Sequence, residues 1–133
     1  MATVYLGLGT NLGDKEANLR TAIYKLQERI GKQVSLSSFY ETAPWGFESD
    51  HSFLNAAIGL ETSLSPIEIL HITQEIEKEL GRTKKSVNGS YSDRLIDIDI
   101  LLYDTLVLQT PELTIPHPSV SYTHLRAHET DSY

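Results

Sequence analysis

Residues 93–103 read DRLIDIDILLY, and the rest of the sequence is best interpreted around this stretch. Apolar and polar residues alternate at a period of two, which predicts a β-strand. Asp97 and Asp99 would then point to one face, roughly 6.5–7 Å apart, while the isoleucines between them would bury on the other. Aspartate is disfavoured in strands. The pair therefore indicates either an ordinary solvated sheet face or a site for a hard cation such as Mg²⁺, which prefers oxygen ligands.

Length and composition narrow the class of protein. The chain has 133 residues, which suggests one domain with a core of its own. Its net charge of −7 argues against non-specific nucleic-acid binding. The absence of cysteine excludes disulfides and thiolate metal sites. The first residues lack the features of a signal peptide, and no apolar run reaches the length of a membrane span. We therefore expect a soluble, cytoplasmic protein.

Hydrophobic periodicity predicts that strands and helices alternate along the chain. Strands are expected over residues 3–8, 34–40 and 53–62, in addition to the aspartate strand, and helices over residues 15–30 and 66–80. A long loop is expected over residues 41–52. The 53–62 strand is expected to alternate, with Leu54, Ala56, Ile58 and Leu60 on one face and Phe53, Asn55 and Ala57 on the other.

The ends of these elements carry capping signals. Asp14 is expected to cap the first helix, and Gly31 to end it in a left-handed conformation. Ser65 and Glu68 have the spacing of a capping box. After the aspartate strand, residues 106–108 are expected to turn back and pair with it.

A glycine-rich turn over residues 7–14 is the first candidate for ligand contact. It fits neither the dinucleotide fingerprint nor the P-loop. Gly7 and Gly9 are therefore more readily explained by close packing than by phosphate binding, and Gly13 by a tight turn.

Two loops and one strand are further candidates. The loop over residues 41–52 holds the only tryptophan, Trp45, and is either a binding lid or a plug at the edge of the core. Phe53 and Asn55 would share one face of a strand, where they offer an aromatic wall and an amide to a planar heterocycle. The basic segment over residues 81–93 either closes over phosphates or is an ordinary surface loop.

Taken in order, these motifs resemble the 6-hydroxymethyl-7,8-dihydropterin pyrophosphokinases, a family of folate biosynthesis. The resemblance covers residues 1 to about 119 and is carried by GTNLGD (9–14), SFYET (38–42), FLNAA (53–57), Glu77, Gly81-Arg82, RLIDIDIL (94–101) and TIPHP (114–118). It implies an α+β fold, namely a ferredoxin-like α/β sandwich in which helices pack on a mainly antiparallel sheet.

The resemblance also implies an activity: transfer of pyrophosphate from ATP to 6-hydroxymethyl-7,8-dihydropterin, which yields the pterin diphosphate and AMP. Asp97 and Asp99 would bind two Mg²⁺ ions, and the catalytic residues would be Arg82, Arg94, Asp97 and Asp99. The pterin site would comprise Thr42, Ala43, Pro44, Trp45, Phe53 and Asn55. The ATP site would comprise Gln74, Glu77, Arg82, Lys84, Tyr91, Arg94, Ile100 and His117. We expect a monomer without nucleic-acid or membrane partners.

Residue chemistry supports this interpretation independently. Pyrophosphoryl transfer requires alignment of a hydroxyl with the β-phosphorus and neutralisation of charge. Carboxylate-bound metal ions and arginines supply the neutralisation, and Asp97 is the one weak candidate for a general base. Lys84 and Tyr91 depart from the arginine and tryptophan that are frequent in the family. The alternatives are a catalytically impaired fragment, or a ferredoxin-like module that only binds nucleotide.

The resemblance stops at the C-terminal end. Residues 121–133 have little apolar periodicity and can be back-translated into an adapter used in DNA library preparation. We therefore predict a pyrophosphokinase domain over residues 1–120, incomplete at its C-terminus, and a non-native, disordered tail over residues 121–133. A chain that ends in this way is expected to be less active and less stable than a full-length enzyme.

Overall fold

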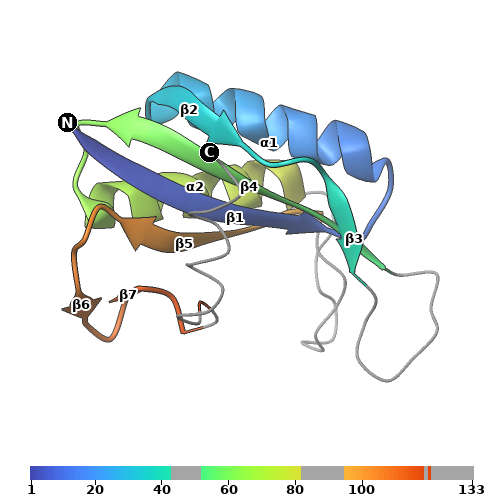
Figure 1. The fold of residues 1–133 in the computed structure, drawn as a ribbon. Coiled ribbons are helices and arrows are strands. Elements are labelled where there is room, and N and C mark those ends of the chain that lie inside the picture. Colours follow the sequence, from blue (N-terminus) through green and yellow to red (C-terminus); the bar gives the residue numbers. More distant parts are fainter. Residues whose placement is uncertain (43–51, 82–94, 119, 121–133) are drawn as a thin grey trace.

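A computed structural model describes residues 1–42, 52–81, 95–118 and 120 (Figure 1). The elements are β1 (Ala2–Thr10), α1 (Lys15–Arg29), β2 (Lys32–Leu36), β3 (Tyr40–Thr42), β4 (Phe53–Thr62), α2 (Pro66–Gly81), β5 (Asp97–Tyr103), β6 (Leu108–Gln109) and β7 (Thr114–Ile115). None of the helices within these ranges is long and apolar enough to cross a membrane.

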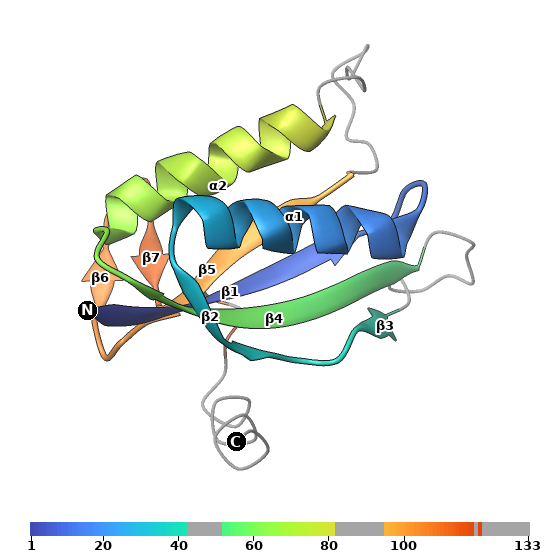
Figure 2. The same cartoon turned by 90° about the horizontal axis from the view of Figure 1, so that it is seen from above.

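The main sheet is antiparallel and has the strand order β2-β4-β1-β5, with β3 also pairing with β4. Both helices lie on one face of this sheet (Figure 2), and no helix of the described residues covers the other face, which we call the open face. The fold has two strand-helix-strand halves, β1-α1-β2 and β4-α2-β5. Their strands interleave in the order given above, which is the ferredoxin-like arrangement. The predicted α+β sandwich is therefore confirmed.

The hydrophobic core lies between the sheet and the helices. Successive side chains of a strand point to opposite faces, and each helix presents an apolar stripe to the sheet. The buried side chains include Val4, Leu6 and Leu8 of β1, Leu19, Ala22, Ile23 and Leu26 of α1, Ala56, Ile58 and Leu60 of β4, Ile69 and Ile76 of α2, and Ile98 and Ile100 of β5. Full burial of one such aliphatic side chain contributes roughly 1.5–3 kcal/mol, so this layer holds the sheet and helices together.

The predicted N-terminal caps are confirmed. The Asp14 carboxylate accepts a hydrogen bond of 3.1 Å from the backbone N–H of Ala17. The Ser65 backbone N–H donates to the Glu68 carboxylate at 2.8 Å, and the Glu68 N–H donates to the Ser65 hydroxyl at 3.2 Å. Each bond satisfies a donor that the first helical turn leaves without a backbone partner.

The predicted role of Gly31 is wrong. The first helix ends at Ile30, which caps it in a right-handed conformation, and among the described glycines only Gly13 has a positive φ. A Cβ at Gly31 would lie 1.8 Å from the carbonyl oxygen of Glu61 in β4. Glycine is needed here because two backbones approach closely, and the Gly13 turn is as expected.

Two strand predictions also need correction. The strand expected over residues 34–40 is divided into β2 and β3, and β3 extends into the expected loop. Residues 106–108 do not pair with β5; instead β6 pairs with β7. The reason is that another segment already bonds to the outer edge of β5 at Leu101. The backbone N–H of His117 donates to the Leu101 carbonyl at 3.1 Å.

The close approach at Gly31 leads to a stability prediction. Gly31→Ala should destabilise the protein by about 1–3 kcal/mol, because the new methyl group forces two backbones apart. Urea unfolding at equilibrium measures the difference. Gly81→Ala is the matched control, since a Cβ there meets nothing within 4 Å. Equal stability of the two variants would contradict this interpretation of Gly31.

The two helices are also joined by an ion-pair cluster. The Arg29 guanidinium donates to both carboxylate oxygens of Glu79, at 2.9 and 2.8 Å, and the Lys25 ammonium lies 3.2 Å from the same carboxylate. The hydrogen bonds from Arg29 and then Lys25 lower the pKa of Glu79 from 4.5 to about 2.

This lowered pKa makes stability depend on pH. A carboxyl group with a depressed pKa in the folded state stabilises the protein above its unfolded pKa, and the contribution is lost as pH falls toward the folded value. Glu79→Gln should therefore be less stable than the parent at pH 7, and the difference should shrink between about pH 4.5 and 2. Thermal unfolding across this pH range measures it. A difference that stays constant down to pH 2 would refute the assignment.

Candidate active site

Glycines of the central strand lie opposite the two aspartates. β1 pairs Gly9 with Asp97 and Gly7 with Asp99. On its other side, β1 pairs Gly9 with Asn55 of β4. Directly paired residues project from the same face of a sheet, so this face has two carboxylates on one side of β1 and an amide on the other. Gly7 and Gly9 add no side chain of β1 between them, although the Leu101 side chain lies 3.4 Å from the place of a Cβ at Gly7 and the Phe53 ring 3.6 Å from that of a Cβ at Gly9.

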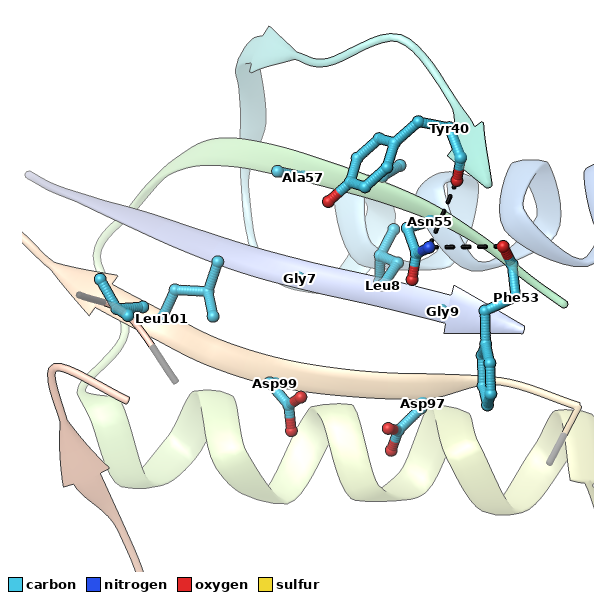
Figure 3. Close-up of a pocket in the computed structure, with 12 residues that line it drawn as sticks. Gly7, Leu8, Gly9, Tyr40, Phe53, Asn55, Ala57, Asp97, Asp99 and Leu101 are labelled. Carbon is cyan, nitrogen blue, oxygen red and sulfur yellow. Dashed lines mark hydrogen bonds between the residues drawn. The ribbon is translucent and has the colours of Figure 1, made fainter. Parts of the chain in front are cut away.

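The side-chain-free strip is the floor of a cavity of about 250 Å³ on the open face (Figure 3). The residues that line it are Gly7, Leu8, Gly9, Tyr40, Phe53, Asn55, Ala56, Ala57, Asp97, Asp99, Leu101 and Val120. Strands lie about 4.7–4.9 Å apart, so the backbones of Asn55 and Asp97, one strand apart on either side of Gly9, are about 9–10 Å apart. That distance suits a small flat ring between the amide and the carboxylates.

The amide half of the cavity is formed by β3 and β4. The Asn55 side-chain nitrogen lies 2.9 Å from the Thr42 hydroxyl and 3.3 Å from the Tyr40 carbonyl oxygen. Phe53, the first residue of β4, lies two residues before Asn55 on the same face, and its ring extends across the end of β1 toward Asp97 (Figure 3). Phe53 and Asn55 thus share a face, as the sequence predicts.

The carboxylate half of the cavity lies on β5. Ile98 and Ile100 are buried on the helix side, so Asp97 and Asp99 project to the open face, which confirms the predicted strand geometry. The imidazole Nε2 of His117 lies 3.7 Å from an oxygen of Asp99. An acidic pair next to a histidine therefore faces the same cavity as the amide.

Glu77 reaches the free edge of β5 from α2. Its carboxylate accepts a hydrogen bond of 2.8 Å from the backbone N–H of Ile98, the residue between the two aspartates. β5 is the last strand of the sheet, so this N–H has no neighbouring strand to bond to. Glu77 supplies the missing acceptor and fixes the strand segment that presents the carboxylates.

Two other residues expected at an ATP site, Gln74 and Ile100, are not among the residues that line the cavity. Gln74 is exposed on α2. The side chain of Ile100 is only 3% exposed and belongs to the core. Since Ile98 directs its N–H to the free edge, Ile100, two residues further along the strand, presents its main-chain groups to the same edge. Any contact of Ile100 with a nucleotide would use its main chain.

Several predicted site residues lie outside the described residues: Ala43, Pro44, Trp45, Arg82, Lys84, Tyr91 and Arg94. The predicted tail over residues 121–133 lies outside them as well. Their assigned roles stay predictions.

Some cavity residues were not identified from the sequence. The sequence favours packing roles for Gly7 and Gly9 and indicates none for Tyr40 and Leu101, yet all four line the cavity. Strand alternation could have indicated Leu101, since it continues the Asp97 and Asp99 series along β5. The glycines could be recognised only from their pairing with the aspartates.

The donor set fits Mg²⁺. Within the described ranges, no group of three or more His, Cys, Asp or Glu residues is arranged to hold a metal ion. Asp97 and Asp99 instead offer two neighbouring carboxylates on an open face. Mg²⁺ commonly binds through one or two carboxylates plus substrate phosphates rather than in an all-protein cage.

A carboxylate pair and an aromatic-and-amide pocket in one cavity could bind a metal ion with phosphates beside a small planar ring. Comparison with known families identifies the class of protein. The 7,8-dihydro-6-hydroxymethylpterin-pyrophosphokinase (HPPK) family matches residues 5–127 of the chain. The chain belongs to this family and is a transferase of the pyrophosphokinase type, as the sequence motifs predict.

Individual relatives agree with this assignment. A Porphyromonas gingivalis protein is 58% identical over 121 residues, which is 90% of this chain and 82% of that protein. A Bacillus subtilis protein is 44% identical over 115 residues, 86% of this chain and 67% of that protein. Both are named 2-amino-4-hydroxy-6-hydroxymethyldihydropteridine pyrophosphokinase.

Solved structures support the fold. A Plasmodium falciparum HPPK-DHPS structure superposes with a TM-score of 0.64 at 17% identity and covers 80% of this chain. The chain spans only 30% of that longer protein. At this level of identity the likeness concerns the fold alone.

The Glu77 contact leads to a local prediction. Glu77→Ala should speed hydrogen exchange at the Ile98 amide by at least about 10-fold, since a hydrogen bond to a charged group contributes about 1.5–3 kcal/mol. Glu77→Gln keeps an acceptor and should speed it less. Amide exchange followed by NMR measures both, with Leu6 as an internal reference. An unchanged Ile98 rate in Glu77→Ala would contradict the role of Glu77 at this strand edge.

Proposed function

We propose that this chain transfers pyrophosphate from ATP to the hydroxymethyl group of 6-hydroxymethyl-7,8-dihydropterin, giving the pterin diphosphate and AMP in folate biosynthesis. One observation carries the proposal. The amide of Asn55 and the carboxylates of Asp97 and Asp99 face one cavity from opposite sides of the Gly7–Gly9 floor. Such a cavity brings an acceptor ring and a charged donor together, which is the main task in phosphoryl-type transfer.

The amide half of the cavity would bind the pterin. The ring would lie against Phe53, since aromatic faces bind flat heterocycles, and would hydrogen-bond to Asn55. Thr42 adjoins Asn55 and completes this half. From outside the described residues, Ala43, Pro44 and Trp45 would contribute the remaining contacts.

The carboxylate half would bind the nucleotide together with two Mg²⁺ ions. Asp97 and Asp99 would hold the Mg²⁺, which would supply charge neutralisation and polarisation of the attacking hydroxyl. Asp97 is also the candidate for accepting the hydroxyl proton. His117 lies beside Asp99 and can donate to a phosphate oxygen.

The remaining nucleotide contacts would come from α2, from the free edge of β5 and from residues 82–94. Glu77 of α2 bonds to the free edge of β5, to which the main chain of Ile100 also turns, and Gln74 is exposed on the same helix. Arg82 and Arg94 would stabilise the charge that develops on the transferred group and on AMP. Lys84 and Tyr91 would line the same site.

The proposed setting follows from the family and the composition. We propose a cytoplasmic monomer that acts on ATP and the reduced pterin, without nucleic-acid or membrane partners. Residues 1–120 would form the catalytic domain.

Formation of AMP tests this function. With ATP, Mg²⁺ and 6-hydroxymethyl-7,8-dihydropterin, the chain should produce AMP and pterin diphosphate in equal amounts. Asp97→Ala and Asp99→Ala should each lower kcat/KM by at least about 100-fold, because each removes charge neutralisation needed in the transition state. Chromatographic separation of the nucleotides measures the rate.

The control is Glu16→Ala, which removes an exposed carboxylate of α1 that pairs with Arg20 on the helix surface. It should leave the rate unchanged. Full activity in both aspartate variants would overturn the proposal. Binding of ATP without AMP formation by the parent would favour the alternative of a nucleotide-binding module.

A further inference from the structure

Asn55 is held in one orientation by its neighbours. Resting on the proposed function, we infer that the Thr42 hydroxyl and the Tyr40 carbonyl fix the Asn55 amide so that only its carbonyl oxygen is available to the substrate. Thr42 is then a positioning residue that acts through Asn55, and the cavity selects a ring edge that donates an N–H group.

Both hydrogens of the Asn55 amide are already used. The nitrogen lies 2.9 Å from the Thr42 hydroxyl oxygen and 3.3 Å from the Tyr40 carbonyl oxygen, with the Phe53 carbonyl oxygen at 3.4 Å. An amide nitrogen carries two hydrogens, and three acceptors already surround it. The Asn55 nitrogen therefore has no hydrogen left for a ligand.

The opposite orientation of the amide is disfavoured. It would place the Asn55 carbonyl oxygen against the carbonyl oxygens of Tyr40 and Phe53, neither of which can donate. The pairing of β3 with β4 sets Tyr40 directly opposite Asn55 and Thr42 opposite Phe53. Backbone pairing thus fixes where the acceptors lie, and only the Thr42 hydroxyl depends on the type of side chain.

The Asn55 carbonyl oxygen faces the cavity above Gly9. A Cβ at Gly9 would lie 3.1 Å from this oxygen, closer than most such contacts. Figure 3 shows the oxygen directed toward β1 and the nitrogen directed away from it. The absence of a side chain at Gly9 therefore keeps this acceptor open to a ligand.

A fixed acceptor gives a rule for ligand choice. A ring edge with an N–H or amino group at this point gains a hydrogen bond, whereas an edge without a donor leaves the oxygen unsatisfied. The aminopyrimidine edge of a pterin carries such donors. The same cavity should reject a ring of equal shape in which the amino group is replaced.

Thr42→Val tests the positioning role. Valine keeps the shape of threonine but removes the hydroxyl, so the dissociation constant and KM for the pterin should rise about fivefold or more, the value of one neutral hydrogen bond. KM for ATP should not change. Thr42→Ser keeps the hydroxyl and should restore pterin binding most of the way. Calorimetry and steady-state rates measure these constants, and unfolding curves verify that each variant is folded.

A second readout tests ligand choice. The probe is the pterin analogue in which methyl replaces the ring amino group, because it has a similar size but no donor. The parent and Thr42→Ser should prefer the pterin over this analogue by at least about tenfold. The preference should be smaller in Thr42→Val, since its Asn55 amide keeps only the two longer contacts, at 3.3 and 3.4 Å, and is held less firmly.

The outcomes separate the two claims. If the parent forms AMP but Thr42→Val keeps both the parent's pterin KM and its preference, the positioning role is wrong and the proposed function stands. If Thr42→Ser is impaired as much as Thr42→Val, the hydroxyl is not the determinant and the inference is likewise overturned. If the parent neither binds pterin nor forms AMP, the proposed function itself fails.

Discussion

The pairing of β1 with both of its neighbours is the constraint on which the site depends. In one row across the sheet, Tyr40, Asn55, Gly9 and Asp97 are paired in sequence. Backbone hydrogen bonds fix this order, and a shift of one residue would send every side chain to the opposite face. The amide and the carboxylate therefore face one cavity only because this register is maintained.

Gly7 and Gly9 lower the local stability of β1, but they leave the floor of the cavity without side chains of this strand. Glycine in a strand interior is less favourable than alanine by roughly 0.5–1 kcal/mol. On the helix face the same strand compensates, since Val4, Leu6 and Leu8 are almost fully buried. β1 thus meets two requirements, a packed core on one face and, at Gly7 and Gly9, a cavity floor without side chains of its own on the other.

Much of the fold can be predicted from local sequence, because the relevant interactions are local. Strand alternation, helical stripes and the caps at Asp14 and Ser65 involve residues a few positions apart. The misjudged features depend on distant residues. Gly31 is determined by the backbone of Glu61, and residues 106–108 cannot occupy the β5 edge because His117 bonds there.

In the site, too, the features that can be predicted are those that involve residues close together in the sequence. Asp97 and Asp99 are recognisable at i and i+2, as are Phe53 and Asn55. The Glu77 contact with Ile98 and the Thr42 contact with Asn55 join different elements, and no local pattern indicates them. Residues in contact across elements must be seen in three dimensions, which is why the orientation of Asn55 emerges only from the structure.

The central proposal is that Asp97 and Asp99 would hold a metal ion on the open face, with β1 between them and Asn55. Mn²⁺ as a substitute for Mg²⁺, added with ATP, tests this directly through paramagnetic broadening of NMR signals. The amides of Gly7 and Gly9 should broaden first, the Asn55 side-chain amide should follow, and Leu26 in α1 should remain sharp. Broadening that spares both glycines, or that persists unchanged in Asp97→Ala and Asp99→Ala, would contradict the account.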